Sequence, residues 1–296
     1  MMSVLFLRSS ALSPLSRMHI QTFRNIGREL YLSSNWKIRP DIKKALQKAL
    51  ESERRGLARM ALEVILKNAE LAVKEKLPLC QDTGYPVFFI KIGKTRLRDV
   101  TLLEKGLTLG VKDATLKGPL RWSVVSDPLS RGEMVPNVPP VFHYEYSSIN
   151  GIEITLLVKG FGSENQTALY MLDPVSGPEE VIQIVVDKVR QAGSKACPPY
   201  IVGIGIGGTS ETALLLSKKA TLLNVNSWSK DHRIATLEKN IKRALNKLGI
   251  GPLGVGGNTT ALGVRILTHP THIAGLPVAI TLGCHSTRSA KLRLRI

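Results

Sequence analysis

Residues 197–223 constrain the fold more than any other part of the sequence. They read "CPPYIVGIGIGGTSETALLLSKKATLL". The part up to Gly208 is predicted to be a cysteine loop that runs into a buried strand, because it is apolar and bounded by proline and glycine. The part after it is predicted to be a helix, with Thr209 at its start and Lys218 and Lys219 toward its end. A strand that passes through a tight turn into a helix indicates an α/β protein.

The patterns elsewhere agree with a mixed α/β chain. Apolar residues recur every three or four positions over 41–76, which predicts one long helix or two packed helices, with Asp41 as the N-cap after Pro40. Further helices are predicted over 99–116, 178–195 and 229–248, strands over 87–93, 141–146, 152–160 and 275–284, and a Pro-rich loop over 120–140. We expect mixed sheets flanked by helices, in one compact domain over residues 29–296.

The formal net charge is +18, and much of the excess lies at the two ends of the chain. Residues 1–28 carry four arginines and no acid, and the last nine residues carry four basic side chains and no acid. The N-terminal composition suits a mitochondrial transit peptide, and equally an extension from an upstream start codon. We expect residues 1–28 to form a basic extension that is disordered or weakly ordered.

Such a charge would by itself favour an acidic partner such as nucleic acid. Outside the two ends, however, the basic residues are spread along the chain, and no RNA-recognition or helix-turn-helix signature is present. A basic surface that attracts a small dianion, or an acidic partner subunit, explains the charge equally well. No apolar run is long enough to span a bilayer. We therefore expect neither a nucleic-acid partner nor a membrane.

Three cysteines, Cys80, Cys197 and Cys284, stand far apart in loops or at a strand end. An odd, widely spaced set does not suit a disulfide scaffold, so we expect a reducing compartment, the cytoplasm. Three thiolates with a histidine could hold zinc. Three thiolates could also hold a [4Fe–4S] cluster in which one iron lacks a protein ligand. Their spacing alone favours ordinary core or loop cysteines over a shared metal site.

Polar neighbours of these cysteines have two readings each. Asp82 precedes Thr83 and Gly84, and aspartate in that position forms turns. A carboxylate beside a metal-bound hydroxyl could instead move its proton. His272, in "HPTHIAGLP", could be a loop histidine satisfied by the backbone, or it could donate to a carboxylate.

The hexapeptide "GIGIGG" (203–208) matches the dinucleotide-binding pattern G-x-G-x-x-G between a strand and a helix. It lies two-thirds of the way along the chain, and no ribose-binding acid is clearly placed after it; Asp231 follows a helical stretch and not a second strand. A tight strand-to-helix turn explains the glycines without a nucleotide. An NAD-dependent oxidoreductase remains an alternative.

Taken together, the motifs resemble a known family. The matching segments are "LPLCQDTGYP", "LRWSVVSDP", "KGFGSEN", "ACPPYIVGIGIGGTSETALLLSKKATL", "GVGGNTTALGV" and "THIAGLPVAITLGCHSTR". They are similar to the α subunit of two-subunit iron–sulfur hydro-lyases, which comprise class I fumarate hydratases and L(+)-tartrate dehydratases. The resemblance runs from about residue 28 to residue 290 and implies the cluster-binding domain of that group.

The resemblance implies a [4Fe–4S] cluster with one open iron, held by Cys80, Cys197 and Cys284. It implies that a small dicarboxylate, either fumarate and malate or tartrate, is bound by Gln81, Arg121 and Gly162. It also implies catalytic roles for Asp82 and His272. Asp82 would manage the proton on the substrate hydroxyl, and Arg121 would clamp a carboxylate with paired hydrogen bonds.

Two departures from the family pattern affect these expectations. The glycine loop reads Lys159-Gly160-Phe161-Gly162-Ser163, with phenylalanine where the family usually has glycine. The chain also ends soon after Cys284, whereas single-chain members continue into a domain that supplies the carbon base. We therefore expect a separate β subunit, in a heterotetramer. Fumarate hydration is the expected activity; the alternatives are L(+)-tartrate dehydration and an iron–sulfur sensor module.

Overall fold

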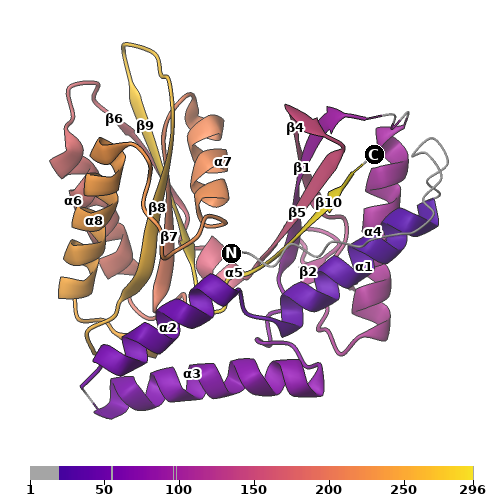
Figure 1. Cartoon of the computed structure of the whole chain (residues 1–296), viewed down its shortest axis with the longest axis horizontal. Coiled ribbons are helices and arrows are strands. Elements are labelled where there is room, and N and C mark those ends of the chain that lie inside the picture. The colour runs from indigo at the N-terminus through magenta and orange to yellow at the C-terminus, as the bar shows by residue number, and fades with distance from the viewer. Residues whose placement is uncertain (1–19, 55, 96, 98, 296) are drawn as a thin grey trace. The chain divides into compact units, whose positions relative to one another are not determined.

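Two four-stranded sheets organise the chain (Figure 1). The computed structural model describes residues 20–54, 56–95, 97 and 99–295. The described residues form two compact units, each with one of these sheets. Unit 1 holds residues 39–68 and 161–287, and unit 2 holds residues up to 38, then 69–160, then 288 onward. The mixed sheets flanked by helices confirm the predicted α/β class, while the division into two units was not predicted.

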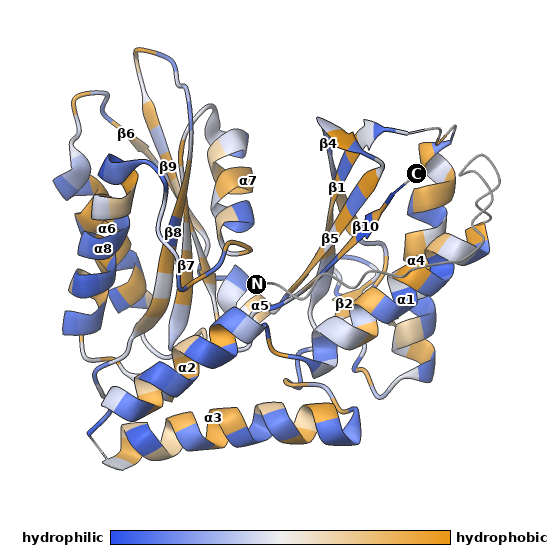
Figure 2. Cartoon of the chain, in the orientation of Figure 1, coloured by the Kyte–Doolittle hydropathy of each residue, from blue (hydrophilic) through white to orange (hydrophobic). Residues whose placement is uncertain are grey.

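Unit 1 is a sheet with helices on both faces (Figure 1). Its strand order is β6 (Ala168–Leu172), β9 (Leu276–Gly283), β7 (Tyr200–Gly207) and β8 (Ala261–His269), and only β7 and β8 are parallel. Its helices are α5 (Phe161–Glu164), α6 (Pro178–Ala192), α7 (Ser210–Ala220), α8 (His232–Lys247) and the 3-10 turn η2 (Pro252–Gly254). Valines and isoleucines of α6, α8 and the sheet fill one core, in agreement with the hydrophobic strands of Figure 2.

The glycines of "GIGIGG" have a structural role in this unit. Gly203 and Gly205 lie inside strand β7, where α7 crosses it closely. A Cβ atom at Gly203 would lie 2.1 Å from the Ser217 carbonyl oxygen, and one at Gly205 would lie 2.0 Å from that of Ala213. Any side chain at either position would push the helix off the strand. This close packing explains the glycine pattern without a nucleotide.

The predicted helical region 41–76 forms two helices, α2 (Pro40–Ser52) and α3 (Gly56–Glu75). Asp41 is not the N-cap of α2, because Arg39 takes that position and Pro40 the first helical one. Instead, both Asp41 carboxylate oxygens accept hydrogen bonds from the Arg39 guanidinium, at 3.0 and 2.6 Å, and one also accepts from the Val225 amide at 3.0 Å. Arg39 also donates to the Thr221 carbonyl at 2.6 Å. This buried pair ties the start of α2 to the segment after α7.

Acid should therefore weaken unit 1 through Asp41. Burial alone raises the pKa of Asp41, but the hydrogen bonds and charge of Arg39 outweigh burial and hold the pKa below its ordinary value. Because the folded pKa lies below the unfolded value of about 3.9, the stabilisation is present above that pH and is lost as the pH falls through the folded pKa. We expect Asp41→Asn to lower the free energy of unfolding at pH 7 by about 3–5 kcal/mol.

Urea denaturation at pH 7 and at pH 3 measures this effect. The difference between the wild type and Asp41→Asn should shrink at the lower pH. Asp187→Asn is the control, because its ion pair with Arg190 is exposed and should contribute less than about 1 kcal/mol. Equal losses in the two variants at pH 7 would contradict the assignment.

Unit 2 packs two helices on its sheet. The strand order is β10 (Arg288–Leu294), β5 (Ile152–Lys159), β1 (Tyr85–Lys94) and β4 (Val141–Asn150), and only β1 and β4 are parallel. The helices α1 (Ile20–Trp36) and α4 (Val100–Lys117) pack against each other, and their apolar side chains form one core with the sheet. A small hairpin, β2 (Val124–Val125) with β3 (Met134–Val135), lies within the predicted Pro-rich loop.

Helix α1 changes the interpretation of the N-terminus. Residues 20–28 were expected to belong to a weakly ordered extension, but they form the first half of α1. Phe23 is completely buried, and Ile26, Leu30 and Tyr31 follow it at helical spacing in the core. The remainder of the expected extension, residues 1–19, lies outside the described residues.

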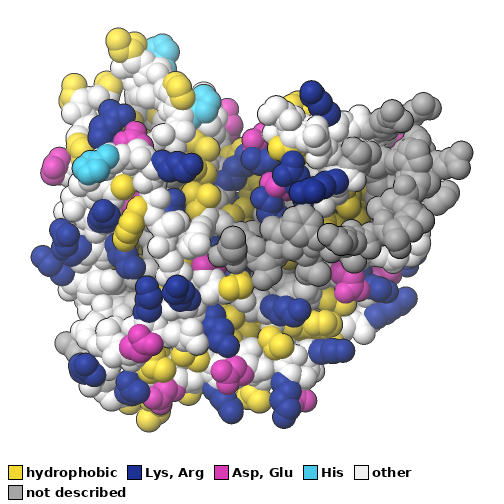
Figure 3. Space-filling view, in the orientation of Figure 1, with side chains coloured by type: hydrophobic (Ala, Val, Ile, Leu, Met, Phe, Trp, Pro, Cys, Tyr) yellow, Lys and Arg dark blue, Asp and Glu magenta, His cyan; other side chains and the backbone are white. Residues whose placement is uncertain are grey.

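Basic side chains are spread over the surface. Figure 3 shows Lys and Arg side chains scattered across the visible face, with fewer acidic ones between them. This distribution agrees with the excess charge counted along the sequence. Among the residues that the structure describes, no helix has both the length and the apolar character needed to cross a membrane.

Candidate active site

The turn that carries Cys80, Gln81 and Asp82 lies in unit 2, between α3 and β1. The Leu79 amide donates to the Asn35 carbonyl of α1 at 2.8 Å, which fixes the start of the turn. Cys80 and Asp82 are partly buried and Gln81 is exposed. One Asp82 carboxylate oxygen accepts the Gly84 amide at 2.9 Å, and Gly84 has a positive φ of 74°. Asp82 therefore forms the turn, as the simpler of its two interpretations predicted. Its second carboxylate oxygen does not take part in this hydrogen bond.

Arg288 lies beside Asp82 and was missed by the sequence analysis. Among the described residues it is the largest fully buried side chain, only 2% exposed, at the first position of β10. Its Nη1 donates to the Asn35 side chain at 2.8 Å. A Cβ atom at Gly160 would lie 3.3 Å from an Asp82 carboxylate oxygen and 3.4 Å from Arg288 Nη2. The guanidinium and the carboxylate thus face the same glycine, which places a buried positive charge behind the turn.

Arg121 begins the long loop of unit 2. Its side chain is exposed, and its carbonyl oxygen accepts the Thr83 hydroxyl at 2.6 Å. The backbone of Arg121 is thereby joined to the turn that carries Gln81 and Asp82. The structure brings these three predicted site residues together within unit 2.

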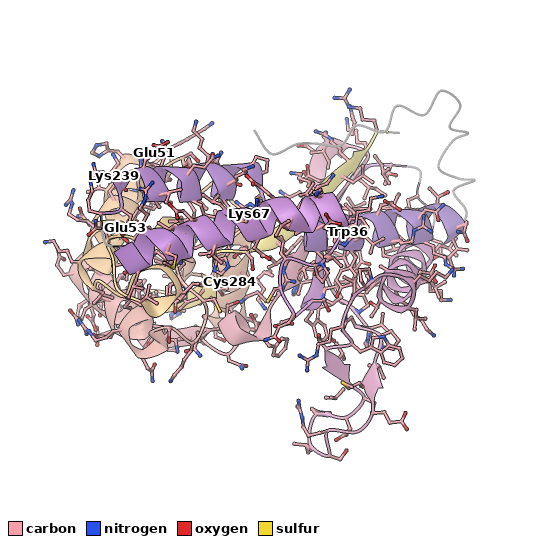
Figure 4. The ribbon with its side chains drawn as sticks, turned by 90° about the horizontal axis from the view of Figure 1, so that it is seen from below. Trp36, Glu51, Glu53, Lys67, Lys239 and Cys284 are labelled. Atoms are coloured by element: carbon pink, nitrogen blue, oxygen red, sulfur yellow. The ribbon has the colours of Figure 1, made fainter. Side chains whose placement is uncertain are left out.

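Cys197 and Cys284 are brought together in unit 1. Cys284 follows β9 (Figure 4), and the next residue, His285, reaches back to the Cys197 carbonyl. The His285 amide donates to this oxygen at 3.2 Å, and its ring Nδ1 lies 3.0 Å from it. The hydroxyl of Ser286 lies 3.2 Å from the sulfur of Cys284. The contacts of His285 with the Cys197 carbonyl therefore hold the two cysteine loops together.

The backbone at Cys197 is strained. Its φ is +51°, in the left-handed region that costs a residue with a side chain about 1 kcal/mol or more. Its side chain is exposed. A strained conformation that exposes a thiol is typical of functional positions, where glycine would otherwise be the easier residue.

Tyr200 and His285 lie in the buried surroundings of these thiols. Burial, together with the smaller effect of the nearby Cys197 and Cys284, raises the pKa of Tyr200 to about 12. Its hydroxyl donates to the Gly193 carbonyl at 2.5 Å. Burial lowers the pKa of His285 below its ordinary value, so the neutral ring is favoured. Near pH 7, neither Tyr200 nor His285 therefore places a charge beside the two thiols.

Gly162 and His272 also lie in unit 1, on exposed segments. Gly162 belongs to the short helix α5, and Phe161 beside it is 48% exposed, so this side chain is largely turned to solvent. His272 lies in the loop between β8 and β9, where its Nδ1 accepts the Ala274 amide at 3.1 Å. This bond leaves the Nε2–H as the donor of the neutral ring. No hydrogen bond or ion pair joins His272 to a carboxylate among the residues that the structure describes.

The donor set fits an iron–sulfur cluster in its chemistry. None of the three cysteines is in a disulfide, and each lies in a loop between secondary-structure elements. Thiolates of this kind are the protein ligands that such clusters use. Cys80 belongs to unit 2 and the other two to unit 1. Within the described ranges, no three His, Cys, Asp or Glu side chains lie close enough to hold a metal ion.

Comparisons with known proteins identify the family. A family model described as "Fumarate hydratase (Fumerase)" matches residues 25–293. A protein of Methanocaldococcus jannaschii named "Putative L(+)-tartrate dehydratase subunit alpha" is 40% identical over 274 residues, which cover 90% of this chain and 96% of that protein. The "L(+)-tartrate dehydratase subunit alpha" of Escherichia coli K12 is 31% identical over 255 residues, 85% of this chain and 84% of that protein. The chain therefore belongs to the fumarate hydratase (fumerase) family and corresponds to its alpha subunit.

Proposed function

We propose that this chain is the alpha subunit of an iron–sulfur L(+)-tartrate dehydratase. The observation that carries the proposal is the similarity over nearly the whole chain to proteins that are named as this subunit. Fumarate hydration, the activity expected from the sequence, becomes the second candidate, because the matching family model bears that name. Both are hydro-lyase reactions on small dicarboxylates.

The proposed roles follow the chemistry of each side chain. Cys80, Cys197 and Cys284 would hold a [4Fe–4S] cluster, which when bound supplies an open iron as a Lewis acid toward the substrate hydroxyl. Asp82 would take and return the proton of that hydroxyl. The exposed guanidinium of Arg121 would bind a carboxylate through two parallel hydrogen bonds.

Three further residues would complete the contribution of this chain. Gln81, exposed on the same turn as Asp82, would hydrogen-bond the substrate, and the backbone at Gly162 would leave room for it. His272 would donate from Nε2 to a substrate oxygen. The base that removes the carbon-bound proton would come from a separate β subunit, which the names of the relatives as alpha subunits support. We propose that two copies of each chain assemble.

Substrate assays with and without the partner test this function. The chain and its β subunit are produced together without oxygen, and L(+)-tartrate, fumarate and malate are compared. We expect kcat/KM for tartrate dehydration to exceed that for malate dehydration by at least about tenfold, since a site that hydrogen-bonds the second hydroxyl of tartrate loses binding energy when that hydroxyl is missing. The chain alone should have less than about 1% of the activity, because the proposed carbon base belongs to the β subunit.

The opposite preference would assign the chain to fumarate hydratase. Full activity of the chain without its partner would contradict the two-subunit proposal. Iron binding without turnover of any dicarboxylate, even with the partner present, would favour the sensor alternative. Binding of NAD would favour the oxidoreductase.

A further inference from the structure

A fully buried polar cluster joins the Cys80–Gly84 turn to the loop that begins at Arg121. We call it the Asn137 cluster; its members are the side chains of Tyr31, Thr83 and Asn137 and the carbonyl group of Arg121. All three side chains are completely inaccessible to solvent. The Asn137 side-chain nitrogen lies 3.0 Å from the Tyr31 hydroxyl, 3.2 Å from the Thr83 hydroxyl and 3.0 Å from the Arg121 carbonyl.

The cluster fixes backbone on both sides. The Tyr31 hydroxyl is 3.0 Å from the Thr83 carbonyl and 2.9 Å from the Gly84 carbonyl, which holds the turn. The Asn137 side-chain oxygen accepts the Ser123 amide at 2.7 Å, and the Arg121 carbonyl accepts the Thr83 hydroxyl at 2.6 Å. The backbone groups before and after Trp122 are thus both anchored to the cluster.

The loop has little other structure that would fix Arg121. Its two strands, β2 and β3, are two residues long, and an isolated hairpin of that size is not stable in water. Its tip is exposed, with Leu129 91% accessible. The position of the Arg121 guanidinium is therefore set by the anchored backbone at the start of the loop.

We propose that Thr83 and Asn137 are positioning residues that set the distance from Arg121 to Gln81 and Asp82. They thereby set the affinity of the site for a dicarboxylate. The proposal rests on the proposed function in that Arg121 binds a carboxylate. Thr83 lies two residues after Gln81 and binds the Arg121 backbone directly, so any movement of the loop root changes the separation of the two binding groups. Because the three side chains of the Asn137 cluster are inaccessible to solvent, they would act through the backbone and not through direct contact with the substrate.

Exchanging the Thr83 hydroxyl for a methyl group tests the coupling. Thr83→Val keeps the shape but leaves the Arg121 carbonyl with one donor fewer, whereas Thr83→Ser keeps the hydroxyl. In the enzyme assembled with its partner, we expect Thr83→Val to raise KM for the dicarboxylate about tenfold with kcat changed less than about threefold, the pattern of lost uniform binding. Thr83→Ser should remain within about twofold of the wild type in both constants.

A second measurement needs no activity. Trp122 follows Arg121, is 39% exposed, and is one of three tryptophans, so Trp36→Phe and Trp228→Phe leave it as the sole reporter in the full chain without metal. We expect Thr83→Val to raise the acrylamide quenching of Trp122 fluorescence by about 1.5-fold, because a loop released from its anchor exposes more of the ring. Thr83→Ser should not change it.

Ser34→Ala is the matched control. Ser34 is 1% exposed in the same unit, and its hydroxyl has no hydrogen-bond partner among the described residues. Its loss should leave the quenching and the KM unchanged. If Thr83→Val lowers the melting temperature but leaves both the KM and the Trp122 quenching at the values of Thr83→Ser, the cluster only stabilises the fold and the proposal is wrong. If the wild-type assembly turns over no dicarboxylate, the proposed function fails, and the quenching result alone decides whether Thr83 positions the loop.

Discussion

Replacing Cys197 with alanine is expected to remove the iron and the activity while leaving the chain folded. The side chain of Cys197 is exposed, so its loss should cost little stability. Without one of three thiolates, iron should fall from about four per chain to below about one, because each thiolate is a ligand that the cluster requires. Turnover should then fall by at least about 10³-fold, since the hydroxyl loses the Lewis acid that makes it a leaving group.

A glycine at the same position separates strain from ligation. Cys197 has a positive φ, which glycine adopts without the steric cost that cysteine bears. Cys197→Gly should therefore lose iron as Cys197→Ala does, yet the metal-free chain should be more stable than the alanine variant by up to about 1 kcal/mol. Such a result would show that the wild-type residue is kept at a cost to stability.

Ser286→Ala controls for indirect effects on the thiols. It removes the hydroxyl 3.2 Å from the sulfur of Cys284 but leaves all three proposed ligands in place. Iron content should stay near the wild-type value. The measurement is iron and acid-labile sulfide on protein kept without oxygen. A Cys197→Ala chain that still holds a full cluster would exclude Cys197 as a ligand.

Elements with strong local signals were predicted well. The segment 200–220 forms a strand, a glycine turn and a helix as expected, because apolar periodicity and turn residues act over a few positions. Helix α1 was missed although Phe23, Ile26 and Leu30 have helical spacing, because the arginine-rich composition of residues 1–28 was given more weight than that period. The N-cap of α2 was predicted two positions too late, at Asp41 in place of Arg39. The Asp41 carboxylate pairs with the Arg39 guanidinium and does not cap the helix.

Long-range features had no comparable signal. The chain passes between the two units after residues 38, 68, 160 and 287, and of these points only the third, in the glycine loop 159–163, has a glycine-rich composition. Arg288 is bound by Asn35, 253 positions away, and Asn137 by Tyr31, 106 positions away. A single polar residue gives no indication of whether it will be buried, because its partners are set by tertiary packing and not by its neighbours. The candidate ligands and substrate-binding residues could be predicted only because they lie in long motifs that resemble those of a known family.

Replacing Asp82 with asparagine is expected to separate proton transfer from cluster binding. Asparagine keeps the oxygen that accepts the Gly84 amide, so the turn should keep its shape. It removes the carboxylate that would hold the hydroxyl proton, and the loss of such a group typically lowers kcat by about 10²–10⁴-fold. Iron content should stay at the wild-type level. Asp127→Asn is the matched control, because Asp127 forms a similar turn in an exposed loop of the same unit and should change kcat less than about twofold.

Arg288 allows a sharper form of the same test. Its buried guanidinium faces Gly160 together with the Asp82 carboxylate, so the two side chains should act as one unit. Arg288→Met should lower kcat in the wild-type background, where it leaves Asp82 without its neighbouring positive charge. In the Asp82→Asn background the same change should have much less effect on kcat, because residues that act together are not additive. Steady-state kinetics of the two single variants and the double variant, with iron measured in each, give the answer. Additive losses would mean that Arg288 supports the fold of unit 2 and not the carboxylate, and a loss of iron in Asp82→Asn would mean that this residue holds the cluster in place and does not move a proton.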